Sequence, residues 1–381
     1  MEGPYEPRED SFLLKEQVCK YARGRVLDMG TGTGILAFAA AQQAESVVAA
    51  DISTKALEYA EKEAKRLGLK IDFVDSDLFA AIGGKFDLII FNPPYLPQDK
   101  GMVDSEIYGG KHGYELIERF LIDAKDFLKD DGKILLLFSR LTNKNRVDSV
   151  IEENLYTSEL VAERYMFFET LYVYLINKSG LLKSISHISK LRLETHGRRG
   201  LVYSGELAEQ KIAVKVKNPK STAINRIANE ARFLEIANRM KIGPKIIESG
   251  EGFVIMGWVE GKRLLDFIPL STKGKILEVL RDILNQLYRL DKKGVEKGEM
   301  HNPVKHIIVG SKPVLVDFER AKFSKKPHNL TGFCQFLCSA KVRQLLCEKG
   351  IVLGNITLEA MAYAKKRSDE QFKAILSCLQ P

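Results

Sequence analysis

The feature that most constrains the fold is a short apolar strand that runs directly into a glycine-rich turn and then a helix. Residues 25–29 have the pattern of a buried strand, Gly30, Gly32 and Gly34 follow at every second position, and residues 35–43 are rich in alanine. Glycines in such a turn let another molecule approach the backbone closely. Gly-x-Gly-x-x-Gly dinucleotide sites need a further glycine where this chain has Ile35, so the turn belongs to another class of site.

The rest of the first half continues the alternation of strand and helix. Strands of four to eight residues separated by helices of this length predict a doubly wound, mostly parallel α/β sheet, here with seven strands. The final two strands have no helix between them, which predicts an antiparallel edge. The expected strands are 25–29, 46–51, 71–75, 86–91, 133–138, 160–164 and 171–176, and the expected helices are 10–21, 35–43, 54–67, 114–128 and 143–154.

Acidic side chains stand where the first three strands end. Carboxyl ends of parallel strands meet at one edge of a sheet, where ligands bind. Asp28, placed before the glycines, would repel a pyrophosphate but suits the ammonium group of an amino-acid-bearing cofactor. Asp51 is placed to accept both hydroxyls of a ribose, and Asp77 with Leu78 is placed to meet the adenine. Together with the three glycines, these residues predict a site for S-adenosylmethionine.

The fourth strand ends in Asn92-Pro93-Pro94-Tyr95. Proline has a fixed φ and no N–H, so the backbone leaves the strand in one extended shape. The Asn92 side chain and the Pro93 carbonyl would then accept two hydrogens from a planar NH2 group, on which Tyr95 could stack. The alternative is a plain turn after a strand, which is what an Asn-Pro pair alone usually indicates.

These two motifs together resemble the class I methyltransferases that modify planar nitrogens, a set that includes N6-adenine methylases and HemK-type glutamine methyltransferases. The segment from Tyr5 to Leu14 is similar to the short archaeal and eukaryotic HemK-like branch, and the resemblance extends to about Ile176. It implies a cofactor site lined by Asp10, Ser11, Asp28, Gly30, Gly32, Gly34, Asp51, Asp77, Leu78 and Asn92, with Asn92, Pro93 and Tyr95 holding the acceptor.

The resemblance implies methylation of the glutamine in the Gly-Gly-Gln motif of a class I translation release factor, with a small zinc-binding activator protein as partner. An N6-adenine methyltransferase acting on RNA or DNA is the alternative. Against it, residues 1–179 hold 30 acidic and 22 basic residues, a balance of −8. An enzyme that grips nucleic acid by itself needs a basic face.

The remainder of the chain has the opposite charge, +16, and therefore attracts phosphate-rich partners such as RNA or a ribosome. We expect a first domain over 1–179, a join over 180–190 and a second, α+β domain over 191–381. The acidic N-terminus and the lack of a long apolar run predict a cytoplasmic protein without membrane contact. Five scattered cysteines predict neither a disulfide nor a zinc site.

The second half carries the parts of a phosphate site. Gly197 and Gly200 would form a hairpin that covers phosphates, and Lys215 would reach them. Glu230, on an expected helix over 223–240, would hold that lysine in an ion pair, and Asp317 would hold magnesium. Their order and spacing resemble small atypical protein kinases of the RIO and Bud type, over residues 196–323. That resemblance implies binding of ATP and Mg²⁺.

The sequence departs from that pattern where catalysis would occur. The positions of the catalytic aspartate and asparagine fall on His301 and His306, which leaves Glu299 as the candidate base and His306 as a phosphate contact. Glu319 replaces the glycine usual after Asp317-Phe318. A kinase fold without activity, serving as a basic docking module for RNA, a ribosome or the release factor, is the alternative.

Overall fold

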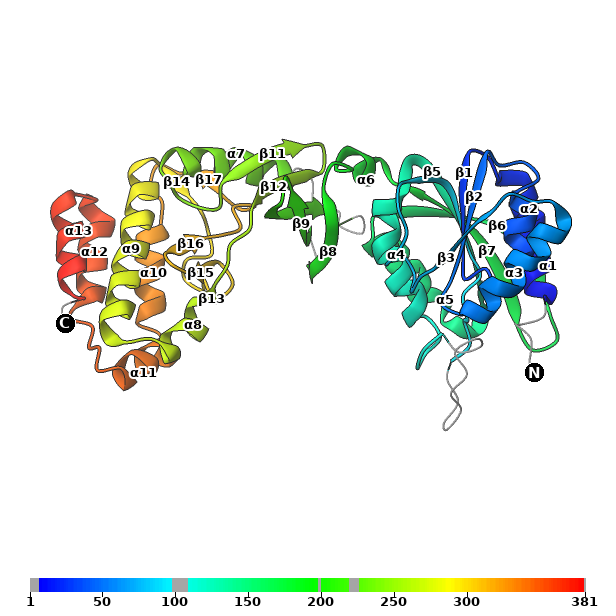
Figure 1. Cartoon of the computed structure of the whole chain (residues 1–381). Helices are drawn as coiled ribbons and strands as arrows, with labels where there is room; N and C mark the ends of the chain where they lie inside the picture. Colours follow the sequence, from blue (N-terminus) through cyan, green and yellow to red (C-terminus); the bar gives the residue numbers. More distant parts are fainter. Residues whose placement is uncertain (1–6, 98–108, 198–199, 219–225, 380–381) are drawn as a thin grey trace. The chain divides into compact units, whose positions relative to one another are not determined.

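A computed structural model describes residues 7–97, 109–197, 200–218 and 226–379 (Figure 1). The chain divides into two compact units, Met1–Arg192 and Leu193–Pro381. The expected join over 180–190 instead contains a short helix and the start of a strand, and the division follows it. No helix in the described ranges is long and apolar enough to span a membrane. Of the segment compared above, Tyr5 and Glu6 lie outside the described residues.

The first unit is built on a seven-stranded sheet with the order β3-β2-β1-β4-β5-β7-β6. β3, β2, β1, β4 and β5 pair in parallel, and β7 and β6 add antiparallel strands at one edge. This confirms the doubly wound, mostly parallel sheet and its antiparallel edge. The strands are β1 (Arg25–Met29), β2 (Ser46–Asp51), β3 (Asp72–Asp75), β4 (Phe86–Phe91), β5 (Leu128–Ser139), β6 (Tyr156–Tyr165) and β7 (Thr170–Lys178).

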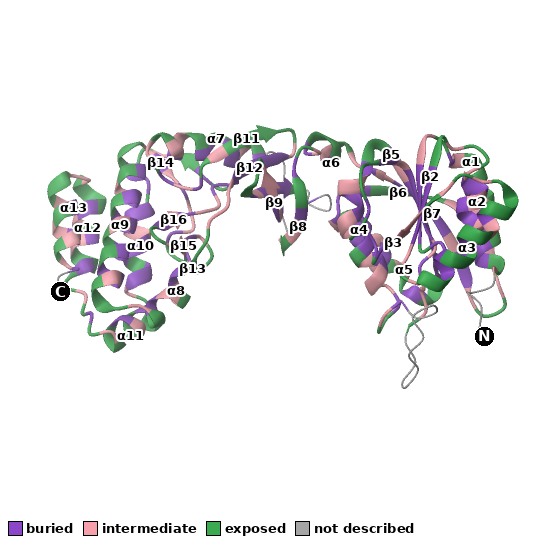
Figure 2. Cartoon of the chain, in the orientation of Figure 1, coloured by how far each residue is buried: buried purple, intermediate pink, exposed green. Residues whose placement is uncertain are grey.

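Helices cover both faces of this sheet because its central strands are apolar on both sides (Figure 2). One face packs against α1 and α2 around Leu14, Val26 and Ile90, all fully buried. On the other, Phe120 of α4 stacks on Phe91 of β4 with ring centroids 4.1 Å apart. The helices are α1 (Glu9–Tyr21), α2 (Ile35–Ala40), α3 (Thr54–Leu67), α4 (Glu115–Phe127), η1 (Arg140–Thr142), α5 (Lys144–Glu153) and α6 (Gly180–Ser184).

β5 begins at Leu128, five residues before the start that the sequence predicted. Its first residues include Asp130-Asp131-Gly132, a composition typical of a turn. Only Leu128 of this early part pairs with β4, opposite Phe86, and pairing resumes at Lys133, so residues 129–132 form an irregular segment within the strand. Gly132 lies close to β4 there: a Cβ at this position would come within 2.8 Å of the Phe86 carbonyl oxygen. The pairing of β4 with β5 is also shifted between Phe86 and Leu88.

The second unit combines an antiparallel sheet, β11-β12-β10-β9-β8, with α7 and a mostly helical remainder. Its core surrounds α9, whose Ile283, Leu284 and Leu287 are fully buried. The strands are β8 (Ser189–His196), β9 (Gly200–Leu207), β10 (Gln210–Lys217), β11 (Ile246–Gly250), β12 (Phe253–Gly257), β13 (Lys262–Arg263), β14 (Val295–Glu296), β15 (Ile307–Val309), β16 (Pro313–Leu315) and β17 (Lys322–Phe323). The helices are α7 (Arg226–Arg239), α8 (Leu264–Phe267), η2 (Ile268–Leu270), α9 (Lys273–Lys292), α10 (Asn329–Leu337), α11 (Ala340–Glu348), α12 (Ile356–Lys366) and α13 (Asp369–Ser377). The first three residues of the expected helix over 223–240 are outside the described ranges.

Candidate functional site

A cavity of about 890 Å³ opens at the carboxyl ends of β1, β2 and β4 in the first unit. Ten of the residues singled out from the sequence line it: Asp10, Ser11, Gly30, Gly32, Asp51, Asp77, Leu78, Asn92, Pro93 and Tyr95. Asp28 and Gly34 do not line it. The sheet edge therefore brings together most of the residues expected there, and it places two of them behind the cavity wall.

The glycine turn provides open space at two of its three glycines. Gly30 and Gly32 have φ values of 68° and 52°, in the left-handed region that favours glycine. A Cβ on Gly32 would meet no protein atom within 4 Å, and one on Gly30 would meet only Phe91 at 4.0 Å. Gly34 differs, since its Cβ would come 2.4 Å from the ring of Phe38. Gly34 thus belongs to the packing at the start of α2, whereas Gly30 and Gly32 leave open space at the cavity.

Asp28 is fully buried and organises the turn from behind. Its Oδ2 accepts hydrogen bonds from the Thr31 hydroxyl at 2.7 Å and from the N–H of Ala37 at 3.0 Å. Its Oδ1 is buried and has no hydrogen-bond partner among the described residues. Burial raises the pKa of Asp28 to about 7, despite those two hydrogen bonds. Asp28 therefore holds an unused acceptor next to the cavity, which suits a cationic ligand group nearby.

Asp51 ends β2 with both carboxylate oxygens facing backbone donors. Oδ2 accepts from the N–H of Gly32 at 2.9 Å, and Oδ1 accepts from the N–H of Ser53 at 2.9 Å. Each carboxylate oxygen can accept a second hydrogen bond. The side chain is thus fixed in direction and still able to accept two hydroxyl hydrogens.

Asp77 is held by a residue that the sequence did not indicate. Arg119 of α4 approaches both of its oxygens, at 3.2 Å and 2.9 Å. The next residue, Leu78, has a φ of 48°, and its carbonyl accepts a hydrogen bond from the Ser76 hydroxyl at 2.7 Å. These contacts fix the turn after β3 at the cavity wall.

A hydrogen bond between Asn92 and Asp10 joins the end of β4 to α1. The Asn92 Nδ2 donates to Oδ2 of Asp10 at 3.0 Å, and Ser11 donates to the other oxygen of Asp10 at 3.4 Å. The amide of Asn92 is therefore oriented with its donor engaged in α1. Its Oδ1 is buried and has no hydrogen-bond partner within the described residues. It is a fixed acceptor in the cavity wall.

The Asn-Pro-Pro-Tyr turn is held from outside. The Thr142 hydroxyl donates to the Tyr95 carbonyl at 2.9 Å. Gly109 and Gly113 pack against the turn so closely that a Cβ would lie 2.3 Å from the Pro94 carbonyl oxygen and 2.5 Å from that of Tyr95. The turn is thus part of a packed assembly, as a residue that positions a ligand must be.

Several lining residues had no signal in the sequence, among them Arg119, Glu169 and Met166. Glu169 lies just before β7, in the connection from β6, and its Oε2 is buried without a hydrogen-bond partner among the described residues. Nothing in the local pattern of an edge hairpin marks a carboxylate that faces a cavity at the far end of the sheet.

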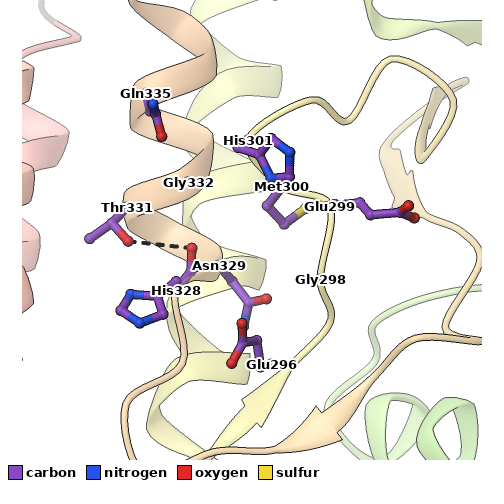
Figure 3. Close-up of a pocket in the computed structure, with 10 residues that line it drawn as sticks. All are labelled: Glu296, Gly298, Glu299, Met300, His301, His328, Asn329, Thr331, Gly332 and Gln335. Atoms are coloured by element: carbon purple, nitrogen blue, oxygen red, sulfur yellow. Dashed lines mark hydrogen bonds between the residues drawn. The ribbon is translucent and has the colours of Figure 1, made fainter.

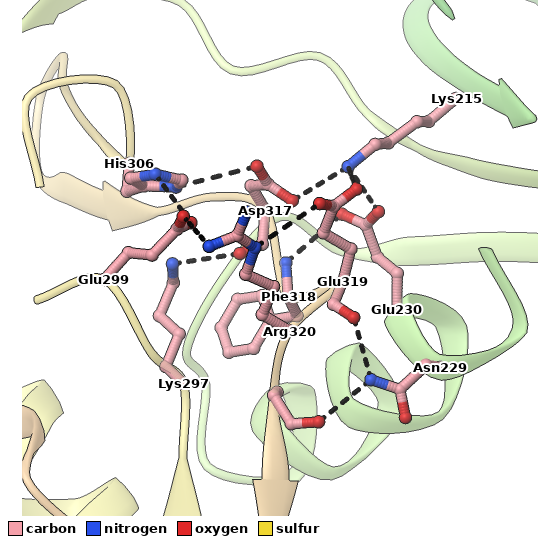
Figure 4. Close-up of polar contacts among 11 residues, drawn as sticks. Lys215, Asn229, Glu230, Lys297, Glu299, His306, Asp317, Phe318, Glu319 and Arg320 are labelled. Atoms are coloured by element: carbon pink, nitrogen blue, oxygen red, sulfur yellow. Dashed lines mark hydrogen bonds and ion pairs between the residues drawn. The ribbon is translucent and has the colours of Figure 1, made fainter. Parts of the chain in front are cut away.

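The second unit holds a compact ion cluster around Lys215 (Figure 4). The Nζ atom lies 2.6 Å from Oε2 of Glu230, 2.8 Å from Oδ1 of Asp317 and 3.6 Å from Oε2 of Glu319. Burial would lower the pKa of Lys215, but the charges of Glu230 and Asp317 outweigh it and raise the pKa, so the lysine stays protonated. The three residues that the sequence placed in one phosphate site do lie together.

A second group of residues adjoins Asp317. His306 lies between Glu299 and Asp317, 3.1 Å from the first through Nε2 and 3.6 Å from the second through Nδ1. Burial and the charge of Lys297 lower the pKa of His306. Lys297 is fully buried, donates to the Asp317 carbonyl at 3.0 Å, and has its pKa lowered by burial to about 8. No pattern in the sequence had indicated Lys297.

His301 belongs to a different place. It lines a cavity of about 310 Å³ between the loop before β15 and the start of α10, together with His328 and Gln335 (Figure 3). Glu299 also borders this cavity, yet its carboxylate contacts His306 and Arg320. Of the two histidines expected near catalysis, the structure therefore places only His306 beside Asp317.

The two hairpin glycines lie next to the lysine. The N–H of Gly197 donates to the Gly200 carbonyl at 3.1 Å, and a Cβ on Gly200 would lie 3.5 Å from Cε of Lys215. Residues 198–199, which separate the two glycines, are outside the described ranges.

A family model and several known proteins match the first unit. The model of the methyltransferase small domain matches residues 9–169. A putative protein N5-glutamine methyltransferase of Methanocaldococcus jannaschii is 37% identical over 175 residues, which cover 44% of this chain and 89% of that protein.

A release factor glutamine methyltransferase of Deinococcus radiodurans is 39% identical over 136 residues, 32% of this chain and 49% of that protein, so the chain spans about half the length of this relative. Among solved structures, the E. cuniculi Mtq2–Trm112 complex, responsible for methylation of the eRF1 translation termination factor, aligns at 30% identity with a TM-score of 0.39, over 46% of this chain and 98% of that one. The identity to the M. jannaschii protein, over nearly its full length, shows that this chain belongs, through its first unit, to the protein N5-glutamine methyltransferase family.

Proposed function

We propose that the first unit transfers a methyl group from S-adenosylmethionine to the side-chain nitrogen of the glutamine in the Gly-Gly-Gln motif of a class I translation release factor. One observation carries this proposal. The Asn92 amide has its donor engaged by Asp10 at 3.0 Å, so its buried Oδ1 is left as an acceptor for a hydrogen of a planar NH2 group.

The lining residues fit such a cofactor. Gly30 and Gly32 offer a stretch of backbone where no side chain intervenes, and Asp51 has acceptor capacity for two hydroxyls. Behind this wall, Asp28 has a buried acceptor with no hydrogen-bond partner among the described residues. When bound, S-adenosylmethionine supplies a methyl group on a sulfonium, which is already a good electrophile. The chain therefore has to orient the acceptor nitrogen more than to activate it.

Orientation is the task of the Asn-Pro-Pro-Tyr turn. Asn92 Oδ1 and the Pro93 carbonyl would each accept one hydrogen of the amide NH2, and Tyr95 would limit the plane of the group. An amide nitrogen is a poor nucleophile because its lone pair is delocalised into the carbonyl. Acceptors placed on its hydrogens are most valuable as positive charge develops there, since they strengthen in the transition state.

A small zinc-binding activator protein is the proposed partner of this unit. β3 ends the sheet order, so its outer edge has no neighbouring strand within the described residues. Helix α3, which contacts β3, exposes two apolar side chains: Tyr59, 46% exposed, and Leu67, 48%. An unpaired edge flanked by apolar side chains is suited to cover by another protein.

Labelled S-adenosylmethionine tests the substrate. The full chain, with and without the activator protein, is offered a class I release factor, the same factor with alanine in place of the motif glutamine, tRNA and DNA. We expect label only on the release factor that keeps its motif glutamine. Label on nucleic acid with none on the release factor would replace this proposal with the N6-adenine methyltransferase alternative.

For the second unit we propose an ATP-binding site of the atypical kinase type. The supporting observation is the cluster of Lys215, Glu230 and Asp317, in which a buried lysine is held 2.6 Å and 2.8 Å from two carboxylates of different elements. Glu230 would keep Lys215 in place, and release of Asp317 to a magnesium ion would free the lysine for phosphate oxygens. Asp317 would hold the divalent cation that accompanies the nucleotide.

Calorimetry with ATP and a divalent cation tests this second proposal. Lys215→Arg keeps the charge but not the point geometry, and Asp317→Asn keeps the shape but not the charge. We expect both to weaken ATP binding by roughly tenfold or more. Equal affinity in the wild type and both variants removes the nucleotide proposal and favours a basic docking module, for which RNA binding by the same proteins is the readout.

A further inference from the structure

We propose that His306 and Asp317 form a binding site for a divalent transition-metal ion, with Glu299 orienting the imidazole. The sequence suggested magnesium at Asp317, with His306 as a phosphate contact. The geometry instead makes the histidine a ligand, and this changes which metal the second unit takes.

The contacts of His306 indicate which ring nitrogen carries the proton. Its Nε2 lies 3.1 Å from Oε2 of Glu299, a distance at which an N–H donates to a carboxylate. A neutral imidazole carries one proton, so with that proton on Nε2 the Nδ1 atom is an acceptor. Nδ1 is buried and has no hydrogen-bond partner among the described residues.

The Nδ1 atom of His306 faces the carboxylate of Asp317. Oδ2 of Asp317 lies 3.6 Å away, too far for a hydrogen bond. Two acceptors therefore face each other in a partly buried place, an unfavourable arrangement unless a cation lies between them. With metal–ligand bonds of about 2.0–2.2 Å, two ligand atoms of one metal ion lie roughly 3–3.6 Å apart. The observed spacing is at the upper end of that range.

The two carboxylates beside His306 are each also held by a cation. Oδ1 of Asp317 is held by Lys215 at 2.8 Å, and Oε1 of Glu299 is held by Arg320 at 2.6 Å. Each carboxylate thus has one oxygen fixed by a cation and the other turned toward His306 (Figure 4). One donor atom from each of Glu299, His306 and Asp317 lies within 4.8 Å of the others. A carboxylate that holds the far nitrogen of a ligating histidine is a common support of metal sites.

The ligand types select the metal. Mg²⁺ takes oxygen ligands in strict octahedral geometry, whereas imidazole suits zinc, iron, nickel and copper. A site with one imidazole and one carboxylate fits the second group better, and its remaining positions are open to water or phosphate oxygens. The competing arrangement is a doubly protonated His306 that serves as counterion to both carboxylates and binds no metal.

Cobalt(II) is the probe, because its visible absorption reports nitrogen ligation and coordination geometry. The metal-free full chain is titrated with Co²⁺ in the absence of ATP and S-adenosylmethionine. We expect one Co²⁺ per chain that is lost in His306→Gln, displacement by Zn²⁺, and no displacement by a hundredfold excess of Mg²⁺. Glu299→Gln should weaken binding on the order of 10–100-fold, as expected for a residue that orients the ligand.

His301→Gln is the matched control, since His301 lines the separate cavity and should leave Co²⁺ binding unchanged. Fluorescence of Trp258, the single tryptophan, reports whether each variant is folded. The same Co²⁺ affinity in wild type and folded His306→Gln, or displacement by Mg²⁺, overturns the inference. Because no nucleotide is present, failure of the ATP proposal leaves this result intact, and Co²⁺ binding does not by itself support ATP binding.

Discussion

The cavity of the first unit and the ion cluster of the second treat buried polar atoms differently. In the first, the Oδ1 atom of Asn92, in the cavity wall, has no hydrogen-bond partner among the described residues. In the second, Lys215 already contacts three carboxylates. A ligand in the first site would add a hydrogen bond, whereas a ligand in the second would have to replace existing ion pairs. In the first unit, a residue that would bind a ligand can therefore be changed with little effect on stability. In the second unit, changing Lys215 should affect both stability and ligand binding.

The largest expected effect is on the stability of the second unit. Lys215→Met leaves Glu230, which is 2% exposed, and Asp317 without their cation. Removing one partner of a buried pair costs about 3–5 kcal/mol, so the free energy of unfolding should fall by that amount. Trp258 fluorescence during denaturant unfolding measures it. Lys275→Met, which breaks an exposed pair with Glu278, is the control and should cost less than about 1 kcal/mol. A loss no larger than the control would show that the cluster is not a coupled unit.

Asn92→Ala should separate binding from chemistry in the first unit. Loss of an acceptor that acts on the transition state costs about 10²–10³ in rate. Affinity for S-adenosylmethionine should change only a few-fold, because Gly30, Gly32 and Asp51 remain. Single-turnover methyl transfer and calorimetry measure the two quantities. Asn285→Ala, whose amide bonds only its own helix, is the control. Retained turnover in Asn92→Ala would reduce the motif to a plain turn.

Asp28 predicts how stability depends on pH. Its folded pKa, about 7, lies above the ordinary value of 3.8, so the folded state holds the proton more tightly than the unfolded state. Its contribution to stability is therefore full below about pH 4 and is lost as pH rises to 7. Between pH 5 and pH 8 the free energy of unfolding should fall by roughly 2–3 kcal/mol. Asp28→Asn should abolish this pH dependence, because asparagine does not titrate.

Denaturant unfolding of wild type and Asp28→Asn at pH 5 and pH 8 tests this. Asp87→Asn is the control: the Lys129 ion pair and the Arg25 N–H outweigh burial and lower the pKa of Asp87, so its own effect falls below pH 4. This variant keeps Asp28 and should therefore lose stability between pH 5 and pH 8 as the wild type does. If the free energy of unfolding changed between pH 5 and pH 8 equally in the wild type and in Asp28→Asn, burial would not raise the pKa of Asp28, and the prediction would be wrong.

The smallest effect is expected from Arg119→Ala. Its ion pair with Asp77 has side chains 58% and 51% exposed, and such pairs contribute about 0.2–1 kcal/mol. Thermal unfolding should shift by a few degrees at most, and cofactor affinity by less than tenfold. A larger loss of affinity without a loss of stability would identify Arg119 as a direct ligand contact.

The sequence predicted the sheet well because strand signals and glycine spacing are local. Residues 25–29, 46–51 and 86–91 have the predicted boundaries, since apolar runs buried on both faces leave no alternative. The early start of β5 was missed because Asp130-Asp131-Gly132 favours a turn locally, whereas Leu128, before it, pairs with Phe86 of β4. His301 and His306 look equivalent in the sequence, and only the course of the loop separates them.

By itself, the sequence determined the order of strands and helices in the first unit and which polar residues stand at strand ends, because both follow from patterns within a few neighbours. Tertiary structure alone decided which of those residues face a ligand. Asp28 and Gly34 turn away from the cavity, while Glu169 and Arg119 reach it from segments far along the chain. It also decided that Asn92 turns its nitrogen to Asp10, 82 positions earlier, and leaves its oxygen in the cavity wall.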